Sequence, residues 1–376
     1  MAKLGCPIYV CVFIFFHLLQ LFSYGVGDVL EVPPFNINQR SLLQYLSLGD
    51  IKIDLPALYI FGDSCVDDGN NNFLPQSAVA NYLPFGIDFD GKPTGRATNA
   101  TLDGFQYPPP ILGMSEADRK ITRTGVNYAS GSSGILSENG RSMHMNVLNF
   151  FQQVDLFENT TLKDLKSSFS NTESFTEYLS KSVFFIHIAS NDLGLTYETT
   201  TPKDSPDKYT EMIVEELFKQ LQRLYKLDAR KFLVNNVSPL GCQPFNINIK
   251  NHITSCVEEV NEHYIYIYNK LLSNSLTKWQ STLSGSKFVL EDLYKIFQDV
   301  YASYGVKDVN TSCCLDRNGA RILPCAQNVA PCEDRKSRVF FDPFHPSESM
   351  HFLWARRLLK DSSVCSPINL TQSMQA

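Results

Sequence analysis

The chain has 376 residues, of which 43% are hydrophobic and 12% aromatic, so it can form a large folded core. Its formal net charge is −6, and it contains no long basic run. Because binding to phosphates requires a concentrated face of Lys and Arg, these numbers argue against a nucleic-acid partner.

Residues 1–27 are predicted to be a secretory signal peptide. Lys3 supplies the positive charge, residues 8–22 form the apolar core, and small residues surround a cleavage position near 25–27. An uncleaved signal anchor is the alternative, because the stretch approaches the roughly 20 residues that a membrane span needs. No other segment is long and apolar enough to span. We therefore expect a secreted protein without a stable membrane span after signal removal.

Beyond a lead-in at residues 28–54, short apolar runs alternate with amphipathic segments. Buried parallel strands are short and mostly apolar, and such runs occur at residues 57–61, 125–130, 183–189, 231–237 and 287–292. Apolar residues at helical spacing predict helices over 207–226, over 257–272 and after His345, with Pro346 suited to the first turn of the last one. The alternation predicts an α/β fold with a parallel central sheet in one domain, residues 55–362, followed by a C-terminal tail, residues 363–376.

The cysteines support export. Ten cysteines less Cys6 and Cys11 of the signal peptide leave eight; four of these crowd into residues 313–332, and Cys242 and Cys256 flank a loop. In a secreted chain such cysteines indicate disulfides, although their pairing stays open. A zinc site at this crowded segment is disfavoured, because no C-x-x-C pair and no His at ligand spacing lie nearby.

Five sequons are candidate glycosylation sites: Asn99, Asn159, Asn236, Asn310 and Asn369. Asn236 is the doubtful one. It ends an apolar, strand-like run, and Pro239 follows its sequon.

Polar residues with catalytic chemistry follow the predicted strands. Ser64 follows the first strand, Gly131 the second and Asn191 the third, while Asp342 and His345 precede the last helix. In parallel α/β sheets such residues gather beyond the carboxyl ends of the strands. A serine becomes a nucleophile when a histidine takes its proton, and a carboxylate orients that histidine. Backbone N–H groups and the Asn191 amide are candidate donors to an oxyanion.

Each of these signals has an ordinary alternative. Ser64 follows a strand as many turn serines do, and the oxygen-rich run at residues 67–72 is also suggestive of a calcium loop, although it lacks EF-hand spacing. A D-x-x-H pair is more often a surface turn. His187, within an apolar run, is interpreted as a satisfied core residue. The order of the signals along one alternating chain favours the catalytic interpretation.

The chain also resembles the plant-type GDSL esterases/lipases of the SGNH hydrolase superfamily. The resemblance covers nearly all of the mature chain and rests on these motifs: FGDSCVDDGNNNF (61–73), FGIDFDGKPTGR (85–96), GVNYASGSSGIL (125–136), IASNDL (188–193), NNVSPLGC (235–242), CVEEVNE (256–262) and FDPFHPSE (341–348). It implies a flavodoxin-like three-layer α/β/α sandwich that needs no metal or other cofactor.

The resemblance assigns roles to individual residues. It implies that Ser64 is the nucleophile, His345 the base and Asp342 its orienting partner, and that Ser64, Gly131 and Asn191 form the oxyanion hole. The asparagines after Gly69 would support the nucleophile's turn. Three positions depart from the family pattern: Cys65 stands where leucine is usual and is expected to be a small buried apolar residue, and Ser132 and Ala189 stand where glycine is usual. The segment after Cys314 also departs from the usual glycine-rich stretch.

The function expected from this set is hydrolysis of carboxylic esters, acyl lipids among them, by a monomeric protein of the apoplast or cell wall. Acyl transfer to another hydroxyl, or deacetylation of a polysaccharide, uses the same residues and stays open. A non-catalytic binding protein on the same fold is the alternative outside enzymology.

Overall fold

The computed structural model describes residues 55–88, 91–97, 108–138, 144–196, 205–249, 256–303, 308–316 and 325–375. The predicted signal peptide, the lead-in and Asn99 lie outside these ranges. Within them, no helix has the length and apolar character needed to cross a membrane.

A five-stranded sheet forms the centre of the molecule, and the predicted parallel α/β architecture is confirmed. Its order is β1 (Leu58–Gly62), β2 (Val183–His187), β3 (Lys231–Asn235), β4 (Lys287–Glu291) and β7 (Cys365–Ser366). The first four strands are parallel, and β7 is antiparallel to β4. Every residue of β1 and β2 is buried, as expected for strands covered on both faces.

The predicted strand at residues 125–130 lies along the free edge of β1. The N–H of Ile60 donates to the Val126 carbonyl (3.1 Å), and the N–H of Tyr128 donates to the Ile60 carbonyl (2.8 Å). Ile60 and Asn127 form a parallel bridge. The segment therefore occupies the predicted place, although it pairs too briefly to count as a regular strand.

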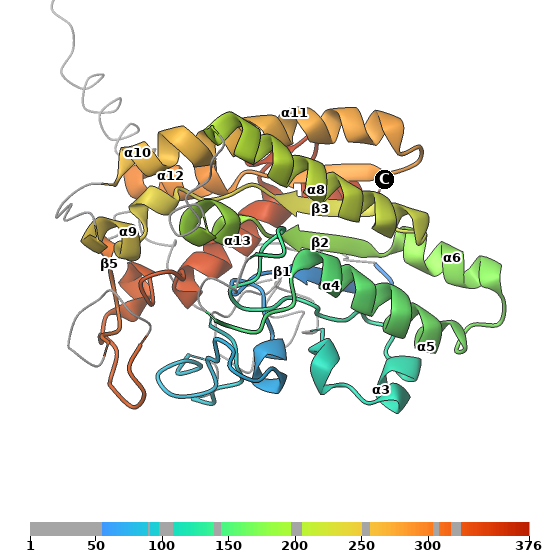
Figure 1. Cartoon of the computed structure of the whole chain (residues 1–376), viewed down its shortest axis with the longest axis horizontal. Coiled ribbons are helices and arrows are strands. Elements are labelled where there is room, and N and C mark those ends of the chain that lie inside the picture. The colour runs from blue at the N-terminus through green and yellow to red at the C-terminus, as the bar shows by residue number, and fades with distance from the viewer. Residues whose placement is uncertain are drawn as a thin grey trace, which may run out of the picture.

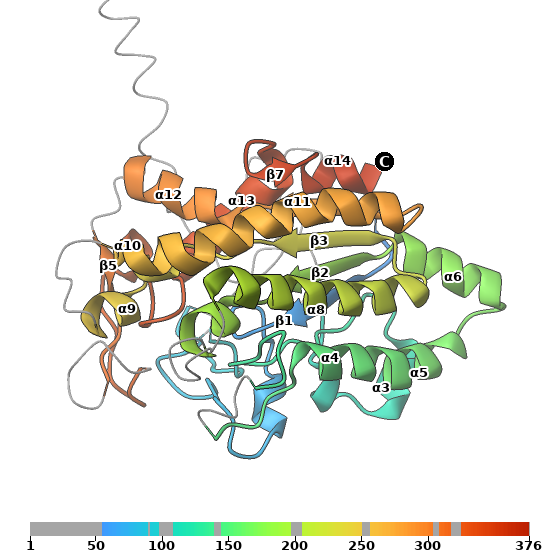
Figure 2. The same ribbon diagram turned by 45° about the horizontal axis from the view of Figure 1, so that its top comes forward.

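Helices cover both faces of the sheet, which gives three layers. One core cluster joins the sheet to α4 (Phe150–Leu156), α8 (Pro206–Lys226) and α11 (Tyr266–Thr282). The opposite cluster joins it to α12 (Leu293–Ser303), α13 (Glu348–Lys360) and α14 (Leu370–Gln375). Figures 1 and 2 show β1, β2 and β3 side by side in the interior, with α8 and α11 running along them. The other α-helices of the described residues are α3 (Glu116–Ile121), α5 (Leu162–Lys166), α6 (Thr172–Lys181), α9 (Pro244–Ile249) and α10 (Glu258–Val260).

Two helix predictions need correction at their ends. The helix expected over 257–272 runs from α10 through a π-helical turn, Asn261–Ile265, into α11 and ends ten residues later, at Thr282. The last helix begins at Glu348, because the Ser347 hydroxyl caps it by accepting the N–H of Met350. Pro346 therefore lies before the cap and not in the first turn.

The segment expected to be a C-terminal tail is part of the fold. β7 extends the sheet beyond β4, and Leu370 at the start of α14 is buried in the second core cluster. The domain therefore continues past residue 362 to at least residue 375, because the apolar residues after Asp361 complete the cover of β4.

The prediction of disulfides is confirmed, and the pairs are Cys242–Cys256, Cys313–Cys332 and Cys314–Cys325. The last two lie beside a small parallel sheet of β5 (Asp308–Ser312) and β6 (Arg338–Phe340). The N–H of Cys314 donates to the carbonyl of Phe341 (3.0 Å). This cross-linked unit therefore holds the chain immediately before Asp342.

Candidate active site

Ser64 lies in a tight turn directly beyond the carboxyl end of β1. Gly62 ends the strand where a Cβ would come within 2.3 Å of the His187 carbonyl oxygen, so only glycine fits there. The Asp63 N–H donates to that same carbonyl (3.1 Å), and Asp63 Oδ1 accepts the N–H of Cys65 (3.1 Å). These bonds to the neighbouring strand and within the turn fix the backbone around Ser64.

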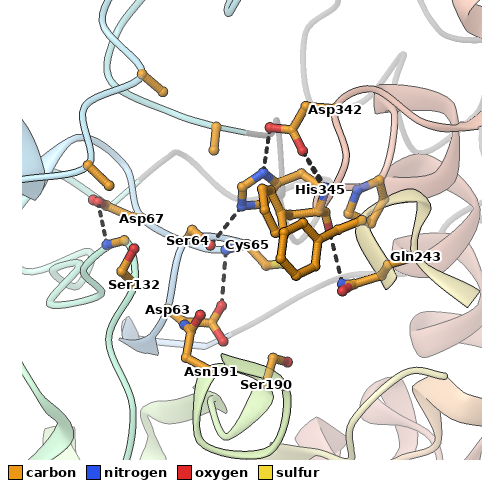
Figure 3. Close-up of a pocket in the computed structure, with 18 of the residues that line it drawn as sticks. Asp63, Ser64, Cys65, Asp67, Ser132, Ser190, Asn191, Gln243, Asp342 and His345 are labelled. Carbon is orange, nitrogen blue, oxygen red and sulfur yellow. Dashed lines mark hydrogen bonds and ion pairs between the residues drawn. The ribbon is translucent and has the colours of Figure 1, made fainter. Parts of the chain in front are cut away.

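Ser64, His345 and Asp342 form one continuous hydrogen-bonded chain (Figure 3). Nε2 of His345 lies 2.7 Å from Ser64 Oγ, and Nδ1 lies 2.7 Å from Asp342 Oδ2. The other oxygen of Asp342 accepts the backbone N–H groups of Phe344 (2.8 Å) and His345 (2.7 Å). The turn after β6 thus aims the carboxylate and the imidazole at each other, in the geometry of a nucleophile, a base and an orienting acid.

The electrostatics of His345 favour its protonated form. Burial by itself lowers the pKa of this imidazole, but the charge and hydrogen bond of Asp342, with a further contribution from Asp63, raise it above its usual value. A proton taken from Ser64 would therefore be held more firmly than by an isolated histidine.

The loop at residues 242–245, which sequence reasoning did not single out, forms hydrogen bonds to the Asp342–His345 turn. The side-chain amide of Gln243 donates to the Phe344 carbonyl (3.0 Å), and the N–H of Phe245 donates to the Pro343 carbonyl (3.1 Å). The disulfide at Cys242 anchors the same loop. Only the assembled fold reveals this contact, because Gln243 and Phe344 are 101 positions apart.

The three predicted oxyanion donors line the same cavity, but they are not equally free. The Gly131 N–H donates to Asp67 Oδ2 and to Asn71 Oδ1, both at 3.1 Å. One N–H of the Asn191 amide donates to the Ser133 carbonyl (2.7 Å), and its second N–H makes no hydrogen bond within the part of the chain that the structure describes. Within the described residues, the Ser64 N–H makes no hydrogen bond to the protein.

Side chains of the run of acids and asparagines after Ser64 are engaged in hydrogen bonds to backbone groups, which argues against a calcium loop. Asp67 Oδ1 accepts the N–H groups of Gly69 (2.8 Å) and Asn70 (2.7 Å). The Asn70 amide donates to the carbonyls of Asn127 (3.0 Å) and Ala129 (2.8 Å), and the Asn71 amide donates to that of Gly131 (3.1 Å). These side chains join the turn that carries Ser64 to residues 127–131.

Two of the departures from the family pattern coincide with unusual backbone. Ser132 has φ 63° and Ala189 has φ 106°, in the left-handed region that favours glycine. The third departure, Cys65, is only partly buried; it packs against the second core cluster and also lines the cavity. The expectation of a small buried apolar residue at this position needs this correction, since the cavity reaches the side chain.

A cavity of about 500 Å³ opens beside the Ser64–His345–Asp342 chain. Part of its wall is apolar and comes from α12, β6 and α13, through Leu293, Phe297, Phe340 and Trp354. Another part comes from the loop after Ser64, through Val79, Ala80, Tyr82 and Phe85.

His187 is not the satisfied core residue that the sequence suggests. It lines the cavity, its Nε2 lies 3.7 Å from Asp63 Oδ1, and its Nδ1 has no hydrogen-bond partner within the described part of the chain. Burial lowers the pKa of His187 to about 3, so the ring is neutral at pH 7 and does not form an ion pair with Asp63. The register that pairs Gly62 with His187 places this ring next to Asp63.

Gln153 of α4 is a further residue that sequence reasoning missed. Its side chain is fully buried, accepts the N–H of Gly62 (2.8 Å) and donates to the carbonyl of Gly62 (2.8 Å). It therefore extends the hydrogen bonding of β1 by one residue, immediately before Asp63 and Ser64.

Comparison with known proteins adds the family context. The family model for GDSL-like lipases/acylhydrolases matches residues 58–358. GDSL esterase/lipase 7 of Arabidopsis thaliana is 36% identical over 327 residues, which cover 82% of this chain and 88% of that protein. GDSL esterase/lipase At1g71691 of the same plant is 35% identical over 370 residues, 94% of each chain. A solved protein assigned to the GDSL-like lipases, from Parabacteroides merdae, covers 81% of this chain and 96% of its own at 11% identity, with a TM-score of 0.33.

Proposed function

This chain belongs to the family of GDSL-like lipases/acylhydrolases, and we propose that it is a secreted serine esterase that hydrolyses acyl-lipid esters through an acyl-serine intermediate. Membership among the esterases/lipases supports carboxylic ester hydrolysis. The observation that carries the mechanism is the continuous contact from Ser64 Oγ through His345 to Asp342, with both hydrogen bonds at 2.7 Å.

The mechanism follows from the roles of these three side chains. Ser64 Oγ attacks the ester carbonyl while His345 Nε2 takes its proton, and the imidazolium then gives that proton to the departing alcohol. Water attacks the acyl-serine, again losing a proton to His345, and Ser64 regains a proton as the carboxylic acid leaves. Asp342 keeps the ring oriented and stabilises its positive charge throughout.

The oxyanion in this proposal is held by the Ser64 N–H and the second amide N–H of Asn191. Gly131 remains the third predicted donor. Its N–H would have to give up a bond to Asp67 or Asn71 first, so that donor is expected to act only after a small rearrangement of the turn. Each such donor is worth about 10²–10³ in rate.

The cavity wall supports an acyl chain as the substrate's acid part. Leu293, Phe297, Phe340 and Trp354 present apolar surface beside Ser64, and each methylene buried there contributes about 0.8 kcal/mol. An acetyl group would use little of this surface, so the geometry favours longer acyl esters over polysaccharide acetates.

Export and glycosylation are part of the same proposal. Three disulfides fit an extracellular protein. Asn159 is exposed and is the sequon that best suits a glycan, whereas Asn236 and Asn369 are buried and their amides bond to Asp292 and Lys360. The side chain of Asn310 lies outside the described residues. A monomeric state and the lack of a nucleic-acid partner stay predictions.

The test is hydrolysis of p-nitrophenyl esters, from acetyl to palmitoyl, by the purified full chain beside Ser64→Ala. Turnover should depend on Ser64, and kcat/KM should rise from the acetyl ester to longer acyl esters. A fluorophosphonate probe should label the wild type and not the variant. Equal turnover in both proteins would refute the mechanism, and labelling failure together with no turnover would favour a non-catalytic binding protein.

A further inference from the structure

Asp63, Cys65 and His187 form a cluster of metal-ligating side chains that the proposed reaction does not use. One ligand atom from each residue lies within 4.8 Å of the others. All three residues line the cavity, so an ion can reach them from solvent. Asp63 Oδ2 is buried without a hydrogen-bond partner within the described residues, and a cation bound at this carboxylate would compensate part of that cost.

The ligand types select the kind of ion. A carboxylate, a thiolate and an imidazole together suit Zn²⁺ or a similar borderline cation, whereas Mg²⁺ and Ca²⁺ prefer all-oxygen sites. Zinc bonds of about 2.0–2.3 Å at tetrahedral angles place ligand atoms roughly 3.4–3.7 Å apart. His187 Nε2 and Asp63 Oδ1 are already 3.7 Å apart. Small side-chain rotations, chiefly of Cys65, would therefore bring all three ligand atoms to bonding distance of one ion.

We propose that Asp63, Cys65 and His187 bind Zn²⁺ as an inhibitory ion beside the nucleophile. The Cys65 thiol gives its proton to solvent as the sulfur–zinc bond forms, and a water takes the fourth position, which three protein ligands leave open. In this proposal the ion is an inhibitor and not a cofactor. The expectation that the hydrolytic reaction itself needs no metal therefore still holds.

Inhibition follows from the position of Ser64 between two of the ligands. An ion held by the residues on either side of Ser64 fixes the turn that carries it. A divalent cation held at Asp63, which lines the same cavity as His345, would oppose the positive charge that forms on the His345 ring during attack. The ion and its water also occupy part of the cavity that the acyl chain would enter.

The first experiment titrates Zn²⁺ into the hydrolysis assay of the full chain, which rests on the proposed function. Zn²⁺ should inhibit, EDTA should restore the rate, and Mg²⁺ at the same concentration should have no effect. Cys65→Leu and His187→Phe should each raise the half-inhibitory zinc concentration by at least about tenfold, measured against each variant's own zinc-free rate. Cys365→Ala is the matched control, since Cys365 is the other described cysteine outside a disulfide and does not line the cavity.

The second experiment does not depend on hydrolysis. Co²⁺ added to Ser64→Ala should give a thiolate-to-cobalt charge-transfer absorption, which Cys65→Leu should abolish and Cys365→Ala should leave intact. A band without esterase activity would uphold the site and refute only the proposed function. The inference is overturned by equal zinc inhibition in the wild type and Cys65→Leu, or by a Ser64→Ala protein that shows no Cys65-dependent band.

Discussion

At the scale of single residues, Asp342 sets the basicity of His345. Burial lowers the pKa of His345 and the attraction to Asp342, 2.7 Å away, more than offsets it. Because the neutral ring is the base, hydrolysis should be lost as pH falls through this raised pKa. Asp342→Asn removes the charge, so the pKa of His345 should fall, and kcat should drop by about 10⁴.

The shift can be measured without turnover. Proton NMR titration of the His345 ring in Ser64→Ala and in Ser64→Ala with Asp342→Asn compares the two pKa values directly. The same pKa in both proteins would show that Asp342 does not control the ring.

Ser132 offers a test of backbone strain at the cavity. Its φ of 63° is costly for a serine, and its side chain makes no hydrogen bond within the described residues. Ser132→Gly should therefore raise the free energy of unfolding by about 0.5–1 kcal/mol. Ser273→Gly is the control of opposite sign, because Ser273 is exposed within α11, where glycine costs about 0.5 kcal/mol. Urea unfolding measures both; a loss of stability in Ser132→Gly would contradict the argument.

The residues of the site differ in how far the sequence predicts them. Ser64, Asp342 and His345 stand at strand and helix ends, where local pattern carries information, and the structure brings them together. The engagement of the Gly131 N–H by Asp67 depends on contacts across 64 positions, which no local pattern encodes. The same holds for His187, whose neighbour Asp63 is known only once β1 and β2 are paired in register.

At the scale of elements, α4 completes β1 through one side chain. Gln153→Ala leaves the Gly62 N–H buried without its partner, which should cost about 1–3 kcal/mol of unfolding free energy. It should also lower kcat, because Gly62 directly precedes the turn of Ser64. Gln298→Ala, at an exposed position of α12, is the control and should change stability little. Denaturant unfolding and the ester assay check both effects, and an unchanged midpoint for Gln153→Ala would count against this role of α4.

Element prediction succeeds where one local signal dominates and fails where packing decides. Four of the five apolar runs fall within two residues of the observed strands, and the fifth, residues 125–130, lies along the free edge of β1. The end of α11 and the roles of β7 and α14 depend instead on which apolar surface remains to be covered. Strand β7 has only two residues, which is too few to show a periodic pattern. These residues form a strand because β4 offers a free edge.

At the scale of the whole molecule, the fold joins groups that are 281 positions apart, Ser64 and His345. The parallel sheet supplies Ser64 and Asn191 at one edge. The Asp342–His345 turn is positioned at that edge by two units. One is the disulfide-linked unit of β5 and β6, and the other is the loop at Gln243. The site is therefore a property of the layered assembly and not of any one motif.

The buried end of β4 gives the molecule a pH-dependent stability. Glu291 is fully buried, and burial raises its pKa to about 8, although a hydrogen bond from Asn235 (2.7 Å) and the charge of Arg357 lower it. In the unfolded chain the carboxyl has its ordinary pKa near 4.5. Between these values the folded state binds the extra proton, so this contribution to stability is fully present below about pH 4.5 and is lost as pH rises through about 8.

Glu291→Gln removes this titration while keeping an oxygen for Asn235. The wild type should therefore lose, relative to Glu291→Gln, a few kcal/mol of unfolding free energy between pH 4.5 and 8. Thermal unfolding of both proteins at half-unit pH steps measures the difference, which should level off above the folded pKa because both states are then ionised. Parallel curves across that window would mean that Glu291 ionises in the folded protein as readily as in water, and that Arg357 and Asn235 outweigh its burial.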